Sequence, residues 1–259
     1  MMHDLIENYR FFVSMQRAGS SMLNNILTEY LTSVDLKYGN PEDVAFVSEA
    51  GPLSAPSFYH EMLSEELKLF IGFRGLPTYA EQELRFPGTK VVFLVRHPFD
   101  ILVSRYYQFY KVSDGGHKKP GSHDFHQEML DLEKTHLSCE KTEIFLADAA
   151  NVLSQYIDIN GLLSRQGAYC QVYNYESFLF NKPHLFACMM NHMGLPVNPQ
   201  EVIRSCKCSD KQIKPGSNLI GEHVRHMYPG DYLNHMDSGL INQLSDKFRD
   251  VVRPLGYLL

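Results

Sequence analysis

A run of six residues, Lys90–Val95 with the sequence KVVFLV, is the strongest constraint on how this chain can fold. After the lysine the run is continuously apolar and rich in branched and aromatic side chains, and no polar residue alternates with them. A strand of this kind is typical of the centre of a parallel sheet, where both faces are buried. The run therefore predicts an α/β protein in which helices flank a central parallel sheet on both faces.

Other segments show the strand and helix patterns that such a sheet needs. We expect further strands at Phe11–Ser14, Leu69–Phe73 and Tyr169–Tyr175, and helices at Ser20–Leu31, from Pro98 to about Tyr110, at Pro183–Met193 and from about Gly239 to Val252. The first helix has six apolar residues on one face: Met22, Leu23, Ile26, Leu27, Tyr30 and Leu31. The third has Leu185, Phe186, Met189, Met190 and Met193 inward. The polar stretch Asp114–His123 is expected to be an exposed loop within a single domain spanning residues 1–259.

The turn between the first strand and the first helix contains the sequence RAGSS, Arg17–Ser21. Backbone N–H groups at a helix start, together with the helix dipole, favour an anion. Gly19 permits a tight turn, Ser20 and Ser21 add hydroxyl donors, and Arg17 adds a permanent charge suited to phosphate. The pattern predicts a phosphate site, and a plain turn capped by serine fits it as well. The triphosphate motif GxxxxGK[ST] is not matched, because Ser20 stands where its lysine should follow Gly19.

A second candidate lies where the KVVFLV strand ends. Arg96 follows that strand directly, and Ser104 lies eight residues later on the expected helix. Ligands bind at the carboxyl ends of the strands in open α/β sheets, so these two residues are candidates for a second anionic group. The alternative is that Arg96 pairs with Asp100 in a surface salt bridge.

Composition narrows the class of function. The formal net charge of −6 argues against a nucleic-acid partner but is compatible with a small anionic ligand. We expect no membrane span, since no segment approaches about 20 consecutive apolar residues. The N-terminal sequence does not look like a signal peptide, and five sparse cysteines suit a reducing, cytoplasmic location. Cys206 and Cys208 lack a second pair at zinc-like spacing, so we expect ordinary thiols and no metal.

Taken together, the motifs resemble those of the sulfotransferase superfamily, which transfers a sulfuryl group from 3′-phosphoadenosine 5′-phosphosulfate (PAPS). Met15–Met22 is similar to the family's 5′-phosphosulfate loop, and Arg96 and Ser104 match its 3′-phosphate residues. QVYNYESFL resembles the family's YEDL strand end and places Tyr175 near the adenosine. VRHMYPGDYLNHMD resembles the C-terminal RKGxxGDWKxxF segment, with Arg225, His226 and Met227 on R-K-G and Tyr232 in place of tryptophan.

The resemblance implies a P-loop-like sulfotransferase fold that binds PAPS without a metal and releases PAP. The residues implied to bind the nucleotide are Arg17, Ala18, Gly19, Ser20, Ser21, Met22, Arg96, Ser104, Tyr175, Arg225, His226 and Met227. Arg17 would stabilise charge on the bridging oxygen, and it cannot act as an acid because a guanidinium does not readily lose a proton.

The acceptor is expected to be a hydroxyl group of a small molecule, which needs a general base. Gly75 stands where the cytosolic branch of the family has its histidine. Glu49 is the first choice for the base, with His60, His123 and His126 as alternatives. The oligomeric state stays open. There are two alternative functions. The protein could bind PAP or PAPS without catalysis, or it could be a P-loop-type kinase.

Overall fold

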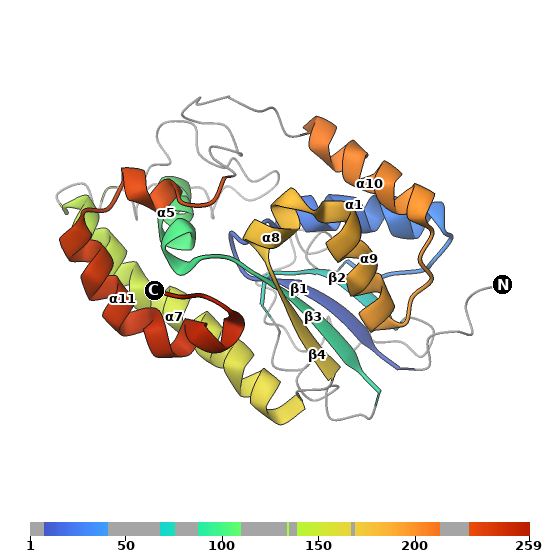
Figure 1. Cartoon of the computed structure of the whole chain (residues 1–259), viewed down its shortest axis with the longest axis horizontal. Coiled ribbons are helices and arrows are strands. Elements are labelled where there is room, and N and C mark those ends of the chain that lie inside the picture. The colour runs from blue at the N-terminus through green and yellow to red at the C-terminus, as the bar shows by residue number, and fades with distance from the viewer. Residues whose placement is uncertain are drawn as a thin grey trace. The chain divides into compact units, whose positions relative to one another are not determined.

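The computed structural model describes residues 8–40, 68–75, 88–109, 134, 139–166, 169–212 and 228–259. The chain divides into two compact units. The first unit comprises residues up to Val95 together with Leu162–Lys214, and the second comprises Arg96–Gly161 and Pro215–Leu259. The helices and strands of both units are labelled in Figure 1.

The first unit contains a parallel sheet of four strands in the order β2-β1-β3-β4 (Figure 1). The strands are β1 (Arg10–Ser14), β2 (Leu69–Phe73), β3 (Lys90–Val95) and β4 (Cys170–Asn174). Every residue of β3 after Lys90 is buried, as a central parallel strand requires. The all-parallel sheet with its helices confirms the predicted α/β fold class.

The strand register brings three strand ends to one edge of the sheet. Ser14, the last residue of β1, lies opposite Leu94 of β3, and Val95 of β3 lies opposite Asn174 of β4. The sequence placed Tyr175 in the last strand, but it is the first residue of helix α8 (Tyr175–Phe180). The strand therefore ends one residue earlier than predicted, and Tyr175 begins the next element at this same edge.

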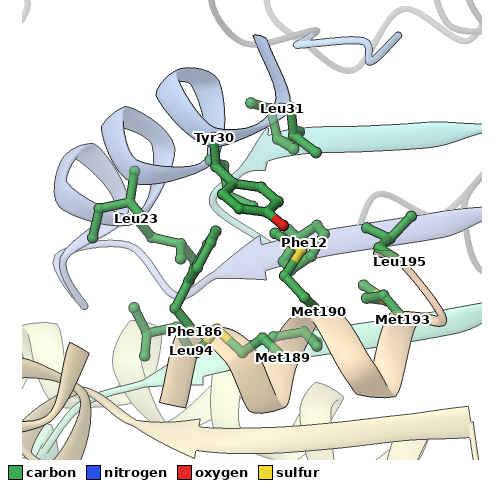
Figure 2. Close-up of a cluster of buried hydrophobic side chains, with 14 of the residues drawn as sticks. Phe12, Leu23, Tyr30, Leu31, Leu94, Phe186, Met189, Met190, Met193 and Leu195 are labelled. Atoms are coloured by element: carbon green, nitrogen blue, oxygen red, sulfur yellow. The ribbon is translucent and has the colours of Figure 1, made fainter. Parts of the chain in front are cut away.

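One face of this sheet packs against two helices of the first unit, α1 (Ser20–Ser33) and α9 (Lys182–Met193). A third helix, α10 (Pro199–Gln212), packs on α1 and α9. The residues of the shared cluster labelled in Figure 2 come from β1, α1, β3, α9 and the residues after α9: Phe12, Leu23, Tyr30, Leu31, Leu94, Phe186, Met189, Met190, Met193 and Leu195. All six predicted inward residues of α1 are buried. In α9 four of the five are buried, and Leu185 is half-buried.

Tyr30 stabilises this core through both its ring and its hydroxyl group. The side chain is fully buried, and its ring meets Phe186 edge-on at a centroid distance of 5.3 Å. The hydroxyl donates to the carbonyl of Pro196 at 2.8 Å and accepts from the N–H of Asn198 at 2.9 Å. Tyr30 thus fixes the connection between α9 and α10 to α1.

The described part of the second unit is built from helices. They are α5 (Pro98–Phe109), α7 (Lys141–Gln166), the 3₁₀ turns η3 (Asp231–Asn234) and η4 (Arg253–Leu255), and α11 (Ser238–Val252). Arg105 of α5 makes a bidentate ion pair with Asp148 of α7 at 2.6 and 2.8 Å. Asn160 of α7 donates to the carbonyl of Val251 in α11 at 2.6 Å. None of the described helices has the length and hydropathy needed to cross a bilayer.

We predict that Tyr30→Phe lowers the free energy of unfolding by about 1–3 kcal/mol, because it removes two part-buried hydrogen bonds, one to the carbonyl of Pro196 and one from the N–H of Asn198. Urea unfolding followed by circular dichroism measures the change. Ser33→Ala is the control, since the exposed Ser33 hydroxyl donates only to the nearby carbonyl of Tyr30. Equal stability of Tyr30→Phe and wild type would contradict this role.

Candidate functional site

The turn between β1 and α1 is held to the sheet by backbone hydrogen bonds. Met15 N–H donates to the carbonyl of Leu94 in β3 at 2.9 Å, and Ala18 N–H donates back to the carbonyl of Met15 at 2.9 Å. Helix α1 then begins at Ser20, and its N-cap is Gly19, with no side-chain cap. The serine-capped turn considered as the alternative is therefore not what forms. The first turn of α1 contains no acidic residue that would repel an anion.

Arg17 has a left-handed backbone, with φ of 70°. Residues other than glycine are uncommon in this region because the Cβ atom meets the following carbonyl oxygen, at a cost of about 1–2 kcal/mol. Backbone strain of this kind concentrates at functional sites. The strain falls on the one arginine that the motif assigned to the phosphosulfate.

Gly19 lies directly against the ring of Tyr175. A Cβ atom added at Gly19 would lie 2.6 Å from Cε2 and 2.7 Å from Cδ2 of that ring, and the backbone of Gly19 is left-handed with φ of 84°. Tyr175 is itself buried, and it follows β4 at the carboxyl edge of the sheet. The structure therefore brings together two motif residues that are 156 positions apart in the sequence.

The other residues predicted for this turn differ in how far their side chains are exposed to solvent. Ala18 and Met22 are buried in the core, so only their backbone is available to a ligand. Ser20 is half-buried and Ser21 is exposed. The turn consequently presents backbone amides, two hydroxyl groups and one guanidinium.

We predict that Gly19→Ala lowers the free energy of unfolding by more than the strain of its left-handed backbone alone would. Gly194→Ala is the matched control, because Gly194 also has a left-handed φ, of 68°, and its added Cβ would meet nothing closer than Lys90 Nζ at 3.7 Å. Gly194→Ala should cost about 1 kcal/mol, and Gly19→Ala should cost about 2 kcal/mol or more, because the Tyr175 ring must move as well. Chemical unfolding of the two variants measures the difference, and equal losses would contradict the ring contact.

Arg96 and Asp100 in the second unit are both buried, 5% and 2% exposed, which is not the surface location that the salt-bridge alternative assumed. The carbonyl of Arg96 accepts a hydrogen bond from the hydroxyl of the buried Tyr156 in α7. The carboxylate of Asp100 accepts from the N–H groups of Gly230 at 2.8 Å and Tyr232 at 3.1 Å. Ser104 is half-buried on α5.

His97, between Arg96 and α5, lies in an aromatic cluster. Its ring stacks on Tyr232 with centroids 4.7 Å apart and an interplanar angle of 1°. Phe99 and Tyr257 meet it edge-on at 5.0 and 5.7 Å. Burial lowers the pKa of His97 to about 4, against the opposing effect of the Asp100 carboxylate. The imidazole is therefore neutral at physiological pH.

We predict that His97 makes the protein less stable in acid. Because its pKa is lower in the folded state than in the unfolded state, the unfolded chain takes up a proton first, and stability is lost as pH falls from about 6.5 towards 4. The loss from this residue alone is about 3 kcal/mol at most. His97→Phe retains an aromatic ring and cannot titrate, so its unfolding free energy should fall less steeply over this range. Urea unfolding at several pH values tests this, and parallel curves would contradict it.

Sequence reasoning missed His97 and Tyr156, and it considered Asp100 only as a surface salt-bridge partner of Arg96. His97 and Asp100 stand in the segment RHPFD between the predicted arginine and serine, where an aspartate in the first turn of the expected helix was a usable signal. Several predicted site residues lie outside the described residues: Glu49, His60, His123, His126, Arg225, His226 and Met227. The loop Asp114–His123 also lies outside them. Among the described residues no three His, Cys, Asp or Glu side chains gather as metal ligands would.

The sequence matches no protein-family model and no curated protein. Solved structures do match. Mouse sulfotransferase SULT7A1, crystallised with PAP, is 15% identical with a TM-score of 0.60, covering 96% of this chain and 86% of its own. A sulfotransferase from Alicyclobacillus acidocaldarius is 14% identical with a TM-score of 0.50, covering 96% of this chain and 94% of its own.

A third similar structure is retinol dehydratase in complex with androsterone and the inactive cofactor PAP. It is 13% identical with a TM-score of 0.50, covering 100% of this chain and 85% of its own. At sequence identities this low, the structural similarity establishes a shared fold and nothing more. The structural similarity therefore confirms the predicted sulfotransferase fold of this chain.

Proposed function

We propose that the protein is a sulfotransferase that moves the sulfuryl group of PAPS to a hydroxyl group of a small molecule. The products are a sulfate ester and PAP. The observation that supports this most is the turn from Met15 to Met22, which has a strained arginine, a left-handed glycine under the Tyr175 ring and no side-chain cap. Two of the similar structures were crystallised with PAP, which agrees with this ligand.

In this proposal the 5′-phosphosulfate binds at the start of α1. The backbone N–H groups of the first turn and the hydroxyls of Ser20 and Ser21 would hold the 5′-phosphate, because oriented amides and the helix dipole favour negative charge there. Tyr175, beside Gly19, would contact the adenosine. The 3′-phosphate would be held by Arg96 and Ser104, together with Arg225, His226 and Met227.

Transfer breaks the bond between sulfur and the bridging oxygen of PAPS and forms a bond between sulfur and the acceptor oxygen. Negative charge grows on the bridging oxygen, where Arg17 would stabilise it electrostatically. A sulfuryl group carries less charge than a phosphoryl group, so we propose that no metal takes part. The proton of the acceptor hydroxyl goes to a general base, for which Glu49 is our first candidate, followed by His60, His123 and His126.

We propose a small-molecule acceptor, in keeping with retinol dehydratase, which was crystallised with androsterone. A cytoplasmic location also remains a proposal. It agrees with the five cysteines, all of which are free thiols in the structure.

The proposed function is tested by calorimetry of wild-type protein with PAP and, separately, with ATP and Mg²⁺, followed by turnover of labelled PAPS against a panel of hydroxyl compounds. A sulfotransferase binds PAP and releases sulfate esters. Binding of PAP without any turnover would favour a non-catalytic binding protein. Binding of ATP with Mg²⁺ and no binding of PAP would favour the kinase alternative and overturn the proposal.

We predict that Arg17→Gly abolishes turnover without destabilising the fold. Glycine adopts the left-handed backbone of Arg17 freely, so the unfolding free energy should change by less than about 1 kcal/mol. Removal of the cation should lower turnover by about 10²-fold or more. Asp35→Gly is the matched control, because Asp35 is exposed and also left-handed, with φ of 54°. Wild-type activity of Arg17→Gly, or equal losses in both variants, would contradict the role of Arg17.

A further inference from the structure

The amino ends of β1 and β3 place two cations side by side. Arg10, the first residue of β1, is the register partner of Lys90, the first residue of β3. Side chains of register partners project from the same face of a sheet, and like charges opposite each other destabilise the pairing. The pair lies at the other end of β1 from the turn that contains Gly19. We therefore looked for a negative charge that compensates it.

Arg10 is held by main-chain carbonyl groups. Its Nε donates to the carbonyl of Met193, the last residue of α9, at 2.7 Å. Its Nη1 shares its hydrogens among the carbonyls of Asn8, Tyr9 and Gly88, at 2.9, 3.0 and 2.8 Å. The carboxyl end of a helix favours a cation, but carbonyl groups carry only partial charges. Nη2 makes no hydrogen bond to any described residue, so its hydrogens remain for another acceptor.

Lys90 and His192 bring two further basic groups to the same end of α9. Lys90 Nζ would lie 3.7 Å from a Cβ atom added at Gly194, the C-cap of α9. His192 lies in the last turn of α9, and its Nε2 is 3.3 Å from the carbonyl of Tyr169. Both basic residues are half-buried. We call Arg10, Lys90 and His192 the basic cluster.

The members of the basic cluster act on one another as like charges. Burial lowers the pKa of Lys90, and the charge of Arg10 lowers it further. Burial also lowers the pKa of His192, as do Lys90 and Arg10, against its contacts with the carbonyls of Tyr169 and Val91. In the part of the chain that the structure describes, no carboxylate forms an ion pair with the cluster or raises one of these pKa values. The cluster thus has no counter-ion among the described residues.

We propose that the basic cluster binds a dianionic phosphate group at the amino ends of the strands. Arg10 Nη2 and Lys90 Nζ supply N–H donors, and charge-assisted hydrogen bonds of this kind are the strong ones. A phosphate dianion matches their two positive charges and has an oxygen for each of several donors, whereas a carboxylate has one charge and two oxygens. His192 adds a further charge when it is protonated. The site goes beyond the proposed function and does not depend on it.

Inorganic phosphate is the probe, added to the whole chain and followed by NMR, with chloride at the same ionic strength for comparison. We expect phosphate to shift the backbone amides of Lys90 and Gly194. The pKa of His192, read from its ring protons, should rise on binding, because the anion offsets the two neighbouring cations. Shifts confined to Gly19 and Ser20 would place phosphate only at the start of α1 and overturn the proposal. The absence of any shift would overturn it as well.

A matched pair of lysine variants separates binding from a purely structural role. Lys90→Gln removes one charge of the cluster and should weaken phosphate binding, read at the Gly194 amide, about tenfold. Lys37→Gln is the control, because Lys37 is an exposed lysine of the same unit. It should leave the affinity within about twofold of wild type. If Lys90→Gln lowered stability but bound phosphate as tightly as wild type, Lys90 would only cap α9, and the proposal would be wrong.

The same phosphate chemistry occurs in small soluble molecules and in the headgroup of phosphatidate. Vesicles of phosphatidylcholine with and without phosphatidate distinguish these sources by co-sedimentation. Sedimentation only with phosphatidate, and its loss in Lys90→Gln, would support a lipid headgroup as the ligand. Phosphate binding by NMR without sedimentation would support a soluble phosphate. If the chain bound neither the vesicles nor inorganic phosphate, the proposal would be overturned, whatever the protein does with PAP.

Discussion

The parallel hydrogen-bond ladder that runs from β1 through β3 to β4 determines where the candidate site of the first unit lies. Its register places Ser14, Val95 and Asn174 at one edge of the sheet, and each of these strands then continues into a motif. The turn after β1 meets the start of α8 after β4, as the contact between Gly19 and Tyr175 shows. A slip of one residue in either pairing would turn the buried side chains of β3 to the opposite faces and separate this pair.

The strands and the helices that border them were readable from the sequence because their apolar patterns are strong. KVVFLV and the six-residue face of α1 form as predicted. Helix α10 was missed because its buried face is made of small and polar residues: Val202, Ser205, Cys206 and Ser209. Helix α7 was also missed, although Ile144, Phe145, Val152, Tyr156 and Ile159 recur at helical spacing. That signal was present between more obvious motifs and was overlooked.

In the candidate site, too, features set by neighbouring residues could be predicted, whereas contacts between residues far apart in the sequence could not. The turn after β1 is a local motif, and its composition predicted a tight turn at Gly19, which has a left-handed backbone in the structure. The anion site at this turn stays a prediction. The left-handed backbone of Arg17 could not be predicted, since arginine does not favour that region. The partners of Asp100 are backbone N–H groups some 130 residues away, and no sequence pattern marks a backbone donor. The candidates for the base, and Arg225, His226 and Met227 of the C-terminal motif, lie outside the described residues and stay predictions.

The backbone of Arg17 has a consequence for how this chain can change over generations. At a left-handed position, mutation to glycine or asparagine relieves strain, so drift without selection would remove the arginine readily. A lineage that no longer needed the cation would gain stability by losing it. Under the proposed function, only selection on the guanidinium itself would keep an arginine at this position, and glycine is the replacement we expect in a descendant without the transfer activity.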